Sequence, residues 1–231
     1  MVVLLLFAAA PAAAETAQEC AGDGDAWSRL SACTDVIEGG DWPGARAAWA
    51  YSNRAMAHAE LGNHLDAFDD HDTALKLDPG NPRAWNNRAT SHARFREYDR
   101  AFRDYRRALE LDPGYINALI NRASLYAETG QPAEAWADYG TAIALEDAAG
   151  RDTAGLAFLQ ADAACQLGEA EDALAGRQPA FENGLFSREE MAATLINTGY
   201  LVRGVEVETE SGRAAFDAAL ERWTLAGCVW D

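Results

Sequence analysis

The triplet Asn-Arg-Ala occurs three times, as Asn53-Arg54-Ala55, Asn87-Arg88-Ala89 and Asn121-Arg122-Ala123. Each copy stands 34 residues after the one before it. A fixed period of this length indicates one helical unit that is copied along the chain, with each copy burying its apolar face against the next. The triplet therefore predicts a fold stabilised by the stacking of units, and it favours binding over catalysis.

Other residue types repeat at the same interval. A bulky residue stands two positions before each triplet, at Tyr51, Trp85 and Leu119. In a second helix, an alanine is followed four positions later by an aromatic residue or histidine, at Ala67 and His71, Ala101 and Tyr105, and Ala135 and Tyr139. Leu-Asp-Pro closes the first two copies, and proline cannot continue a helix. Gly62 and Gly130 are expected to supply turns within the first and third units.

This pattern resembles the tetratricopeptide repeat, in which large, small and aromatic positions precede a terminal proline. The resemblance implies an all-α fold, a right-handed superhelical α-solenoid of antiparallel helix pairs. Alanines at the crossing points would let two helices approach closely, and aromatic residues would fill the gap to the next pair.

The repeat register divides the chain into seven expected segments. They are a signal peptide (1–14), an N-terminal capping helix region (15–44), three repeat units (45–81, 82–115 and 116–150), a degenerate repeat (151–180) and a C-terminal helical hairpin or cap (181–231). The capping region is expected to hold one helix, from Ala26 to Glu38, with Asp25 as its N-cap. The degenerate repeat is expected to begin with a helix from Ala154 to Leu167.

The first residues predict export. An apolar run from Val2 to Ala10 precedes Ala12-Ala13-Ala14, which is an A-x-A cleavage pattern. The run is shorter than the roughly 20 residues of a membrane span, so we expect no span after cleavage. These features predict a periplasmic or secreted protein, although no Lys or Arg precedes the apolar run.

An exported chain can keep disulfides, and the four cysteines form an even set without metal-ligand spacing. Of the three possible pairings we favour Cys20 with Cys33 and Cys165 with Cys228, because each pair is confined to one end of the chain. Free buried thiols remain the alternative.

The charge distribution bears on the class of partner. The chain has a formal net charge of −18, and only the segment 82–115 is basic. Such an acidic chain would be repelled by phosphate backbones and by anionic lipid surfaces, which argues against nucleic acid as a partner.

Catalytic motifs are not evident in the sequence, and we expect neither an enzyme nor a cofactor. His58 and His71 occupy equivalent positions in the two helices of the first unit, so a metal site or metal-dependent enzyme is a remote alternative. Packed core histidines are the simpler interpretation, because each replaces a tyrosine-like residue of the pattern.

The resemblance to the repeat family implies a concave groove that binds a protein or peptide segment. The triplet asparagine stands where family members often contact a peptide backbone, although it could instead bridge adjacent units. The expected partner-binding residues are Asn53, Asn87, Asn121, Arg83, Asn86, Arg94 and Asn117. The triplet arginines are expected to pair with acidic residues and to link neighbouring units.

The C-terminal segment suggests a second type of partner. Ser187 to Glu190 is a capping-box start for a helix that continues to Ile196, and a second amphipathic helix is expected from Arg213 to Trp223. Their order, with Gly-Tyr and a glycine loop between them, is weakly similar to peptidoglycan-binding-like modules. The sequence thus predicts a noncatalytic interaction scaffold of the cell envelope, with peptidoglycan association as the alternative and a plain helical cap as the simplest interpretation of this segment.

Overall fold

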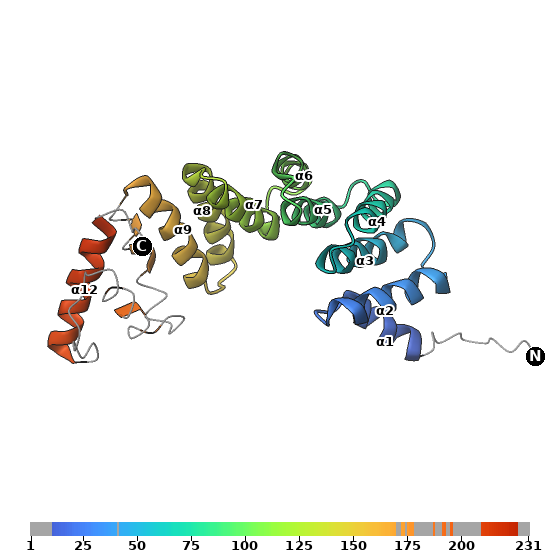
Figure 1. Cartoon of the computed structure of the whole chain (residues 1–231), viewed down its shortest axis with the longest axis horizontal. Coiled ribbons are helices and arrows are strands. Elements are labelled where there is room, and N and C mark those ends of the chain that lie inside the picture. Colours follow the sequence, from blue (N-terminus) through green and yellow to red (C-terminus); the bar gives the residue numbers. More distant parts are fainter. Residues whose placement is uncertain are drawn as a thin grey trace, which may run out of the picture. The chain divides into compact units, whose positions relative to one another are not determined.

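The computed structural model describes residues 11–40, 42–169, 172–173, 175–177, 187, 191–192, 195 and 209–225. Within these ranges every regular element is a helix, which confirms the all-α class (Figure 1). The chain forms two compact units, residues 1–118 and 119–231, and each is described by itself below. The boundary falls inside helix α7 (Ile116–Glu128).

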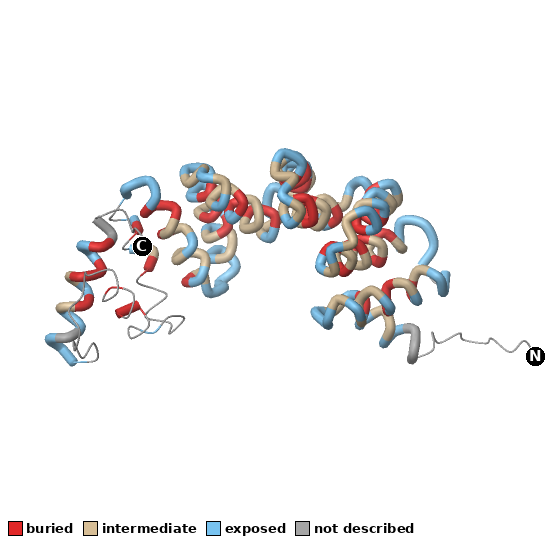
Figure 2. Tube along the Cα trace, in the orientation of Figure 1, coloured by how far each residue is buried: buried red, intermediate tan, exposed pale blue. Residues whose placement is uncertain are grey.

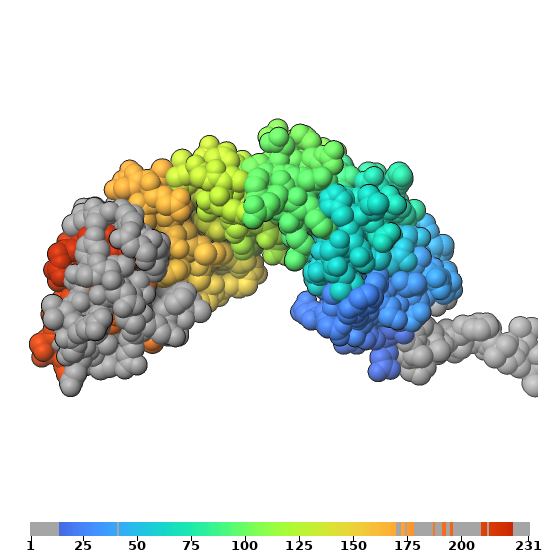
Figure 3. All heavy atoms as spheres, in the orientation of Figure 1, coloured from blue at the N-terminus to red at the C-terminus, as the bar shows by residue number. Residues whose placement is uncertain are grey.

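Two helix pairs make up most of the first unit. They are α3 (Ala48–Glu60) with α4 (His64–Leu77), and α5 (Pro82–Arg94) with α6 (Tyr98–Leu111). A short 3-10 helix, η1 (Gly44–Ala47), precedes α3. Helix α5 packs on both α3 and α4, so that the second pair stacks on the first as the repeat predicts. In the space-filling view the atoms of these helices form one continuous surface on the face that is drawn (Figure 3).

Small residues occupy the contact between paired helices. The alanines of the repeat pattern are completely buried, namely Ala55, Ala67, Ala74, Ala89, Ala101 and Ala108. His71 and Tyr105 fill the equivalent aromatic positions of α4 and α6 and are also buried. Buried residues lie on the sides of the helices that face one another (Figure 2). Close helix approach at alanine, with larger residues filling the next gap, is therefore observed as expected.

The turns within the pairs share one backbone conformation. Gly62 and Gly130 have φ values of 79° and 74°, in the left-handed region, as their predicted turn role requires. The equivalent position of the second pair is Arg96, with φ of 60°. A side chain at such a position is strained, because its Cβ approaches the following carbonyl oxygen.

The N-terminal region contains one helix more than the sequence analysis expected. Helix α2 (Ala26–Gly39) matches the predicted capping helix, and the Asp25 carboxylate accepts hydrogen bonds from the backbone N–H groups of Trp27 and Ser28. Helix α1 (Pro11–Ala21) packs against α2 and is joined to it by the predicted Cys20–Cys33 disulfide. The sequence pattern predicts the helix from Ala26 to Glu38 but not α1, whose first four residues, 11–14, fall in the expected signal peptide.

The second unit contains the end of the repeat region and a further core. Helix α8 (Pro132–Ala148) packs on α9 (Ala154–Leu167), which has the predicted bounds of the degenerate repeat's first helix. Helix α12 (Glu210–Leu225) confirms the helix predicted from Arg213 to Trp223. Phe216 and Trp223 of α12 are buried in one core with Ala164 and Cys165 of α9.

Several sequence predictions fall outside the described residues. They concern Cys228, Glu190 of the capping box, the end of its helix at Ile196, and the Gly-Tyr and glycine loop. Cys165 is disulfide-bonded, and its predicted partner Cys228 is one of these residues. No helix in the described ranges is both long enough and apolar enough for a membrane span.

Candidate functional site

The triplet arginines pair with acidic residues of their own helix pair. Arg54 donates to both carboxylate oxygens of Asp70, at 2.7 and 2.8 Å. Arg88 forms the same bidentate contact with Asp104, and Arg122 with Asp138. The expectation that these arginines pair with acidic residues is confirmed, but within the described residues the expected link to a neighbouring unit is observed for Arg88 alone. Each arginine joins the first helix of a pair to the second, because an aspartate stands 16 residues after it.

Arg88 is the one member of this series for which a contact with the preceding pair is recorded within the described residues. Its Nη1 donates to Asp72 of α4 at 2.9 Å. Its guanidinium lies 4.8 Å from the ring centroid of Trp85. Burial acts to lower the pKa of Arg88, but the Asp104 and Asp72 carboxylates raise it above its ordinary value. The charge of Arg88 is thus held between two carboxylates and an aromatic face.

The triplet asparagines do not share one environment. Asn87 Nδ2 donates to Ser52 Oγ at 3.0 Å, so this amide links α5 to α3. Asn53 is half-buried on α3 and lines a small pocket. Asn121 is half-buried on α7, in the second unit. A bridging role is therefore observed for Asn87.

The pocket at Asn53 brings together two residues that the sequence placed in the partner site. Arg83, at the start of α5, lies beside Asn53 and Trp49 in this pocket, which we call the α3–α5 pocket. Its full lining is Ala48, Trp49, Ser52, Asn53, Asn81, Arg83 and Ala84. Its volume of about 20 Å³ accommodates one small polar group or a water molecule. The Asn81 side chain caps α5 by accepting from Arg83 N–H, which fixes the backbone there.

The other predicted partner-binding residues lie apart from this pocket. Asn86 has an exposed fraction of only 5%, and this burial argues against direct contact with a partner. Arg94 is exposed at the opposite end of α5 from Arg83, about 16 Å along the helix axis. Asn117 is exposed in the first turn of α7. One contiguous site containing all the predicted residues is therefore not observed.

The histidines have separate bonding partners. His71 is completely buried, and its Nε2 lies 2.8 Å from Ser91 Oγ. Burial lowers the pKa of His71 to about 3, so it is neutral at physiological pH. His58 Nδ1 accepts from Asn63 Nδ2 at 3.4 Å. Within the described residues no three His, Cys, Asp or Glu side chains gather as metal ligands, and the metal-site hypothesis has no structural support.

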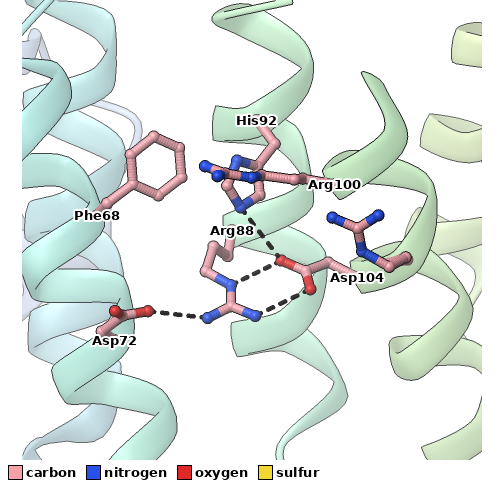
Figure 4. A pocket seen from close by; sticks show the side chains of 7 residues that line it. Phe68, Asp72, Arg88, His92, Arg100 and Asp104 are labelled. Carbon is pink, nitrogen blue, oxygen red and sulfur yellow. Dashed lines mark hydrogen bonds and ion pairs between the residues drawn. The ribbon is translucent and has the colours of Figure 1, made fainter. Parts of the chain in front are cut away.

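A larger cleft, which the sequence analysis did not anticipate, lies between α4 and α6 (Figure 4). It has a volume of about 290 Å³, and α5 contributes to its wall. This α4–α6 cleft is lined by Phe68, Asp72, Arg88, His92, Arg100, Arg103 and Asp104. The sequence signal that could have revealed it is the series Arg100, Arg103 and Arg107, whose spacing places three arginines on one face of a helix.

Comparisons with known proteins identify the repeat. Two tetratricopeptide repeat models match residues 82–115 and 104–137. No curated protein matches the sequence.

Solved structures resemble the chain in fold at low sequence identity. One, described as a functional characterization of Pseudomonas aeruginosa pilF, has a TM-score of 0.66 and 17% identity and covers 91% of each chain. BtubC from P. vanneervenii has a TM-score of 0.60 at 14% identity, covering 93% of this chain and 88% of its own. A thermophilic tetratricopeptide protein of Thermus thermophilus, TTC0263, has a TM-score of 0.56 at 17% identity, covering 84% and 90%.

The first repeat-model match coincides with the repeat unit expected at 82–115, which forms α5 and α6, and the second has the same 34-residue length but begins within α6. This chain therefore contains tetratricopeptide repeats, and in the described pairs α3 with α4, α5 with α6, and α7 with α8 an Arg–Asp pair joins the two helices.

Proposed function

We propose that this protein is a noncatalytic interaction scaffold that binds an extended partner segment along the first helices of its repeats. The observation that carries the proposal is the α3–α5 pocket, where Asn53 of one repeat and Arg83 of the next lie together. Arg83 is exposed, and within the described residues no partner is recorded for its guanidinium. Its donors are thus available to a ligand.

The chemistry of these two residues favours an extended peptide with an acidic side chain. An asparagine amide both donates and accepts, so it can pair with a peptide backbone. A guanidinium pairs with a carboxylate through two parallel hydrogen bonds. The segment 82–115, which holds Arg83, is also the basic part of an otherwise acidic chain, and it would attract an acidic segment.

We also propose that the protein acts in the cell envelope, after export to the periplasm or outside the cell. The apolar N-terminal run with its A-x-A pattern supports export. The Cys20–Cys33 disulfide supports it as well, because disulfides persist in oxidising compartments. Fractionation of cells expressing the full chain with a C-terminal tag tests the location. Recovery only in the cytoplasm, with intact thiols, would overturn it.

The binding site is tested by affinity capture of partners from the native envelope, with mass spectrometry of the retained proteins. Arg83→Glu combined with Arg94→Glu is expected to abolish capture of a specific partner. The matched control is Arg106→Glu combined with Arg107→Glu, which changes the net charge equally at exposed positions of α6. Retention of the partner by the first variant would place the site elsewhere.

Single variants then separate the two ends of α5. Arg83→Glu alone is expected to remove most of the capture, because Arg83 lines the α3–α5 pocket. Arg94→Glu alone is expected to have a smaller effect, since Arg94 lies at the opposite end of the helix. The reverse order would contradict the pocket assignment.

A further inference from the structure

The α4–α6 cleft differs from the α3–α5 pocket in position, size and charge. Three of its lining residues are arginines, contributed by α5 and α6, and two are aspartates. With His92 neutral, the lining carries one net positive charge. Its volume of about 290 Å³ is close to the lower end of the range for small-molecule sites, which is about 300 Å³.

Both aspartates of the cleft are already bonded. Asp104 accepts from Arg88 through both oxygens, and Asp72 accepts from Arg88 Nη1. These contacts pair both carboxylates of the cleft and use three of the five N–H donors of Arg88 (Figure 4). The carboxylates are thus poorly placed to attract a cation.

The other two arginines of the cleft, Arg100 and Arg103, belong to α6. Arg103 is exposed, and among the described residues no hydrogen bond or ion pair is recorded for its side chain. Arg100 has an exposed fraction of 60%, and its recorded partner is Glu97, at 3.2 Å. An exposed pair of this kind contributes little stability, so Arg100 can exchange Glu97 for a ligand at small cost. Figure 4 shows the Arg100 side chain extending into the cleft beside His92.

The fold itself does not require these arginines. The positions 34 residues before Arg100 and Arg103 hold Asp66 and Asp69, and the position 34 residues after Arg100 holds Glu134. The second helix of a repeat therefore forms with acidic residues at the same places. The arginines are a specific property of the second repeat, and their position on a cleft gives them a binding surface.

We propose that the α4–α6 cleft is an oxyanion-binding site that holds a carboxylate or phosphate group against the guanidiniums of Arg100 and Arg103. Both groups form paired hydrogen bonds with a guanidinium. The volume of the cleft leaves room for an organic group attached to the anion. This site is independent of the peptide site proposed at the α3–α5 pocket.

His92 supplies a probe inside the cleft. Its ring stacks on Phe68 with centroids 4.3 Å apart, and its Nδ1 lies 2.6 Å from Glu97 Oε2. Burial lowers the pKa of His92, while Glu97 and Asp104 act in the opposite direction. An anion bound at Arg100 and Arg103 would favour the charged imidazolium and raise this pKa. The other titratable or charged groups facing His92 are His71 and Asp72 of α4, Arg88 of α5, and Arg100 and Arg103 of α6.

Histidine NMR of the full-length protein tests the proposal. The chain has four histidines, and the His92 signal is the one that disappears in His92→Gln. Inorganic phosphate and succinate are titrated separately at constant ionic strength, with chloride as the reference. At least one of them is expected to move the His92 signal saturably and to raise its pKa. A saturable response to phosphate alone, to succinate alone or to both then shows which oxyanion the site binds.

Matched arginine variants distinguish binding of an anion in the cleft from general electrostatic attraction of anions to the basic face of α6. Arg103→Gln is expected to weaken anion binding about tenfold, and Arg100→Gln to a similar extent. Arg106→Gln removes the same charge from an exposed position of α6 outside the lining and is expected to leave binding within about twofold. Unchanged melting temperatures establish that the variants are folded. A response to chloride equal to that of both oxyanions, or equal weakening by Arg103→Gln and Arg106→Gln, would overturn the proposal.

Discussion

Arg88 and Asp104 form a bidentate ion pair between α5 and α6, with Nε–Oδ2 and Nη2–Oδ1 distances of 2.6 and 2.9 Å. The side chain of Asp104 has an exposed fraction of 9%, and that of Arg88 19%. Truncation of Asp104 would leave the largely buried guanidinium of Arg88 with only the exposed Asp72 as its counter-ion, which costs more than the intact pair contributes.

We therefore expect Asp104→Ala to lower the free energy of unfolding by about 2–4 kcal/mol. The double variant Arg88→Met with Asp104→Leu should regain most of this loss, because it removes both charges and retains the side-chain volume. Urea denaturation followed by circular dichroism measures both values. A double variant no more stable than Asp104→Ala would show that the pair contributes through something other than charge compensation.

The strained turn at Arg96 predicts a stabilising substitution. Arg96→Gly removes a Cβ from a residue with φ of 60° and should raise the free energy of unfolding by about 0.5–1 kcal/mol. The converse control is Gly62→Ala, at the equivalent turn, where φ is 79° and no atom lies within 4 Å of the added Cβ. This variant should lose about 1 kcal/mol from backbone strain alone. Equal effects of the two substitutions in thermal melts would contradict this explanation.

The Cys20–Cys33 disulfide predicts a local effect on α1. The bond closes a loop with a sequence separation of 13, for which chain entropy gives about 3 kcal/mol. In Cys20→Ser with Cys33→Ser, the α1 amides should exchange about a hundredfold faster, since α1 packs on α2 and α3 at the end of the first unit. Amides of α5 serve as the internal control and should keep their protection. Uniform loss of protection in both helices would mean that the bond supports the whole unit.

The buried His71 predicts a loss of stability in acid. Its pKa is about 3 in the folded protein, against an ordinary value of 6.5, so the unfolded chain binds the proton more tightly. The contribution of His71 to the free energy of unfolding is therefore fully present above pH 6.5. It falls as the pH is lowered from 6.5 toward 3, by up to about 1.4 kcal/mol per pH unit.

The variant His71→Gln removes this titration and retains a group able to bond to Ser91 Oγ. Its free energy of unfolding should decline less steeply than that of the wild type between pH 6.5 and 4. Measurements at pH 8 give the difference in the free energy of unfolding between wild type and variant that does not depend on His71 protonation. Parallel declines in acid would contradict the assignment to His71.

The helix pairs were predictable because the same kind of contact, the close approach of two helices at a buried alanine, recurs at Ala55, Ala89 and their counterparts. The partner of the triplet arginine was equally accessible, since Asp70, Asp104 and Asp138 follow the same 34-residue interval. Helix α1 was not predictable from periodicity, since it lies outside the repeats and is fixed by packing and a disulfide.

The binding residues were harder to predict than the fold. The sequence analysis placed Asn86 and Asn53 in the same binding site, but Asn86 is buried and Asn53 lines a pocket. Asn86 stands one residue before Asn87, the repeat counterpart of Asn53, and adjacent residues on a helix point in different directions. The α4–α6 cleft requires residues from three helices. The arginine spacing on α6 indicates a charged face, but only packing shows that the face borders a cleft.

Each triplet arginine pairs with an aspartate of its own helix pair, and this affects how such a chain can gain or lose whole repeats. A repeat cut out between successive turns takes both members of its Arg–Asp pair with it, so that no orphaned charge remains at the new junction. The Asp72 carboxylate that Arg88 would leave behind is 54% exposed and can be solvated by water. Repeats of this type are thus electrostatically self-contained modules, which makes their duplication and deletion tolerable.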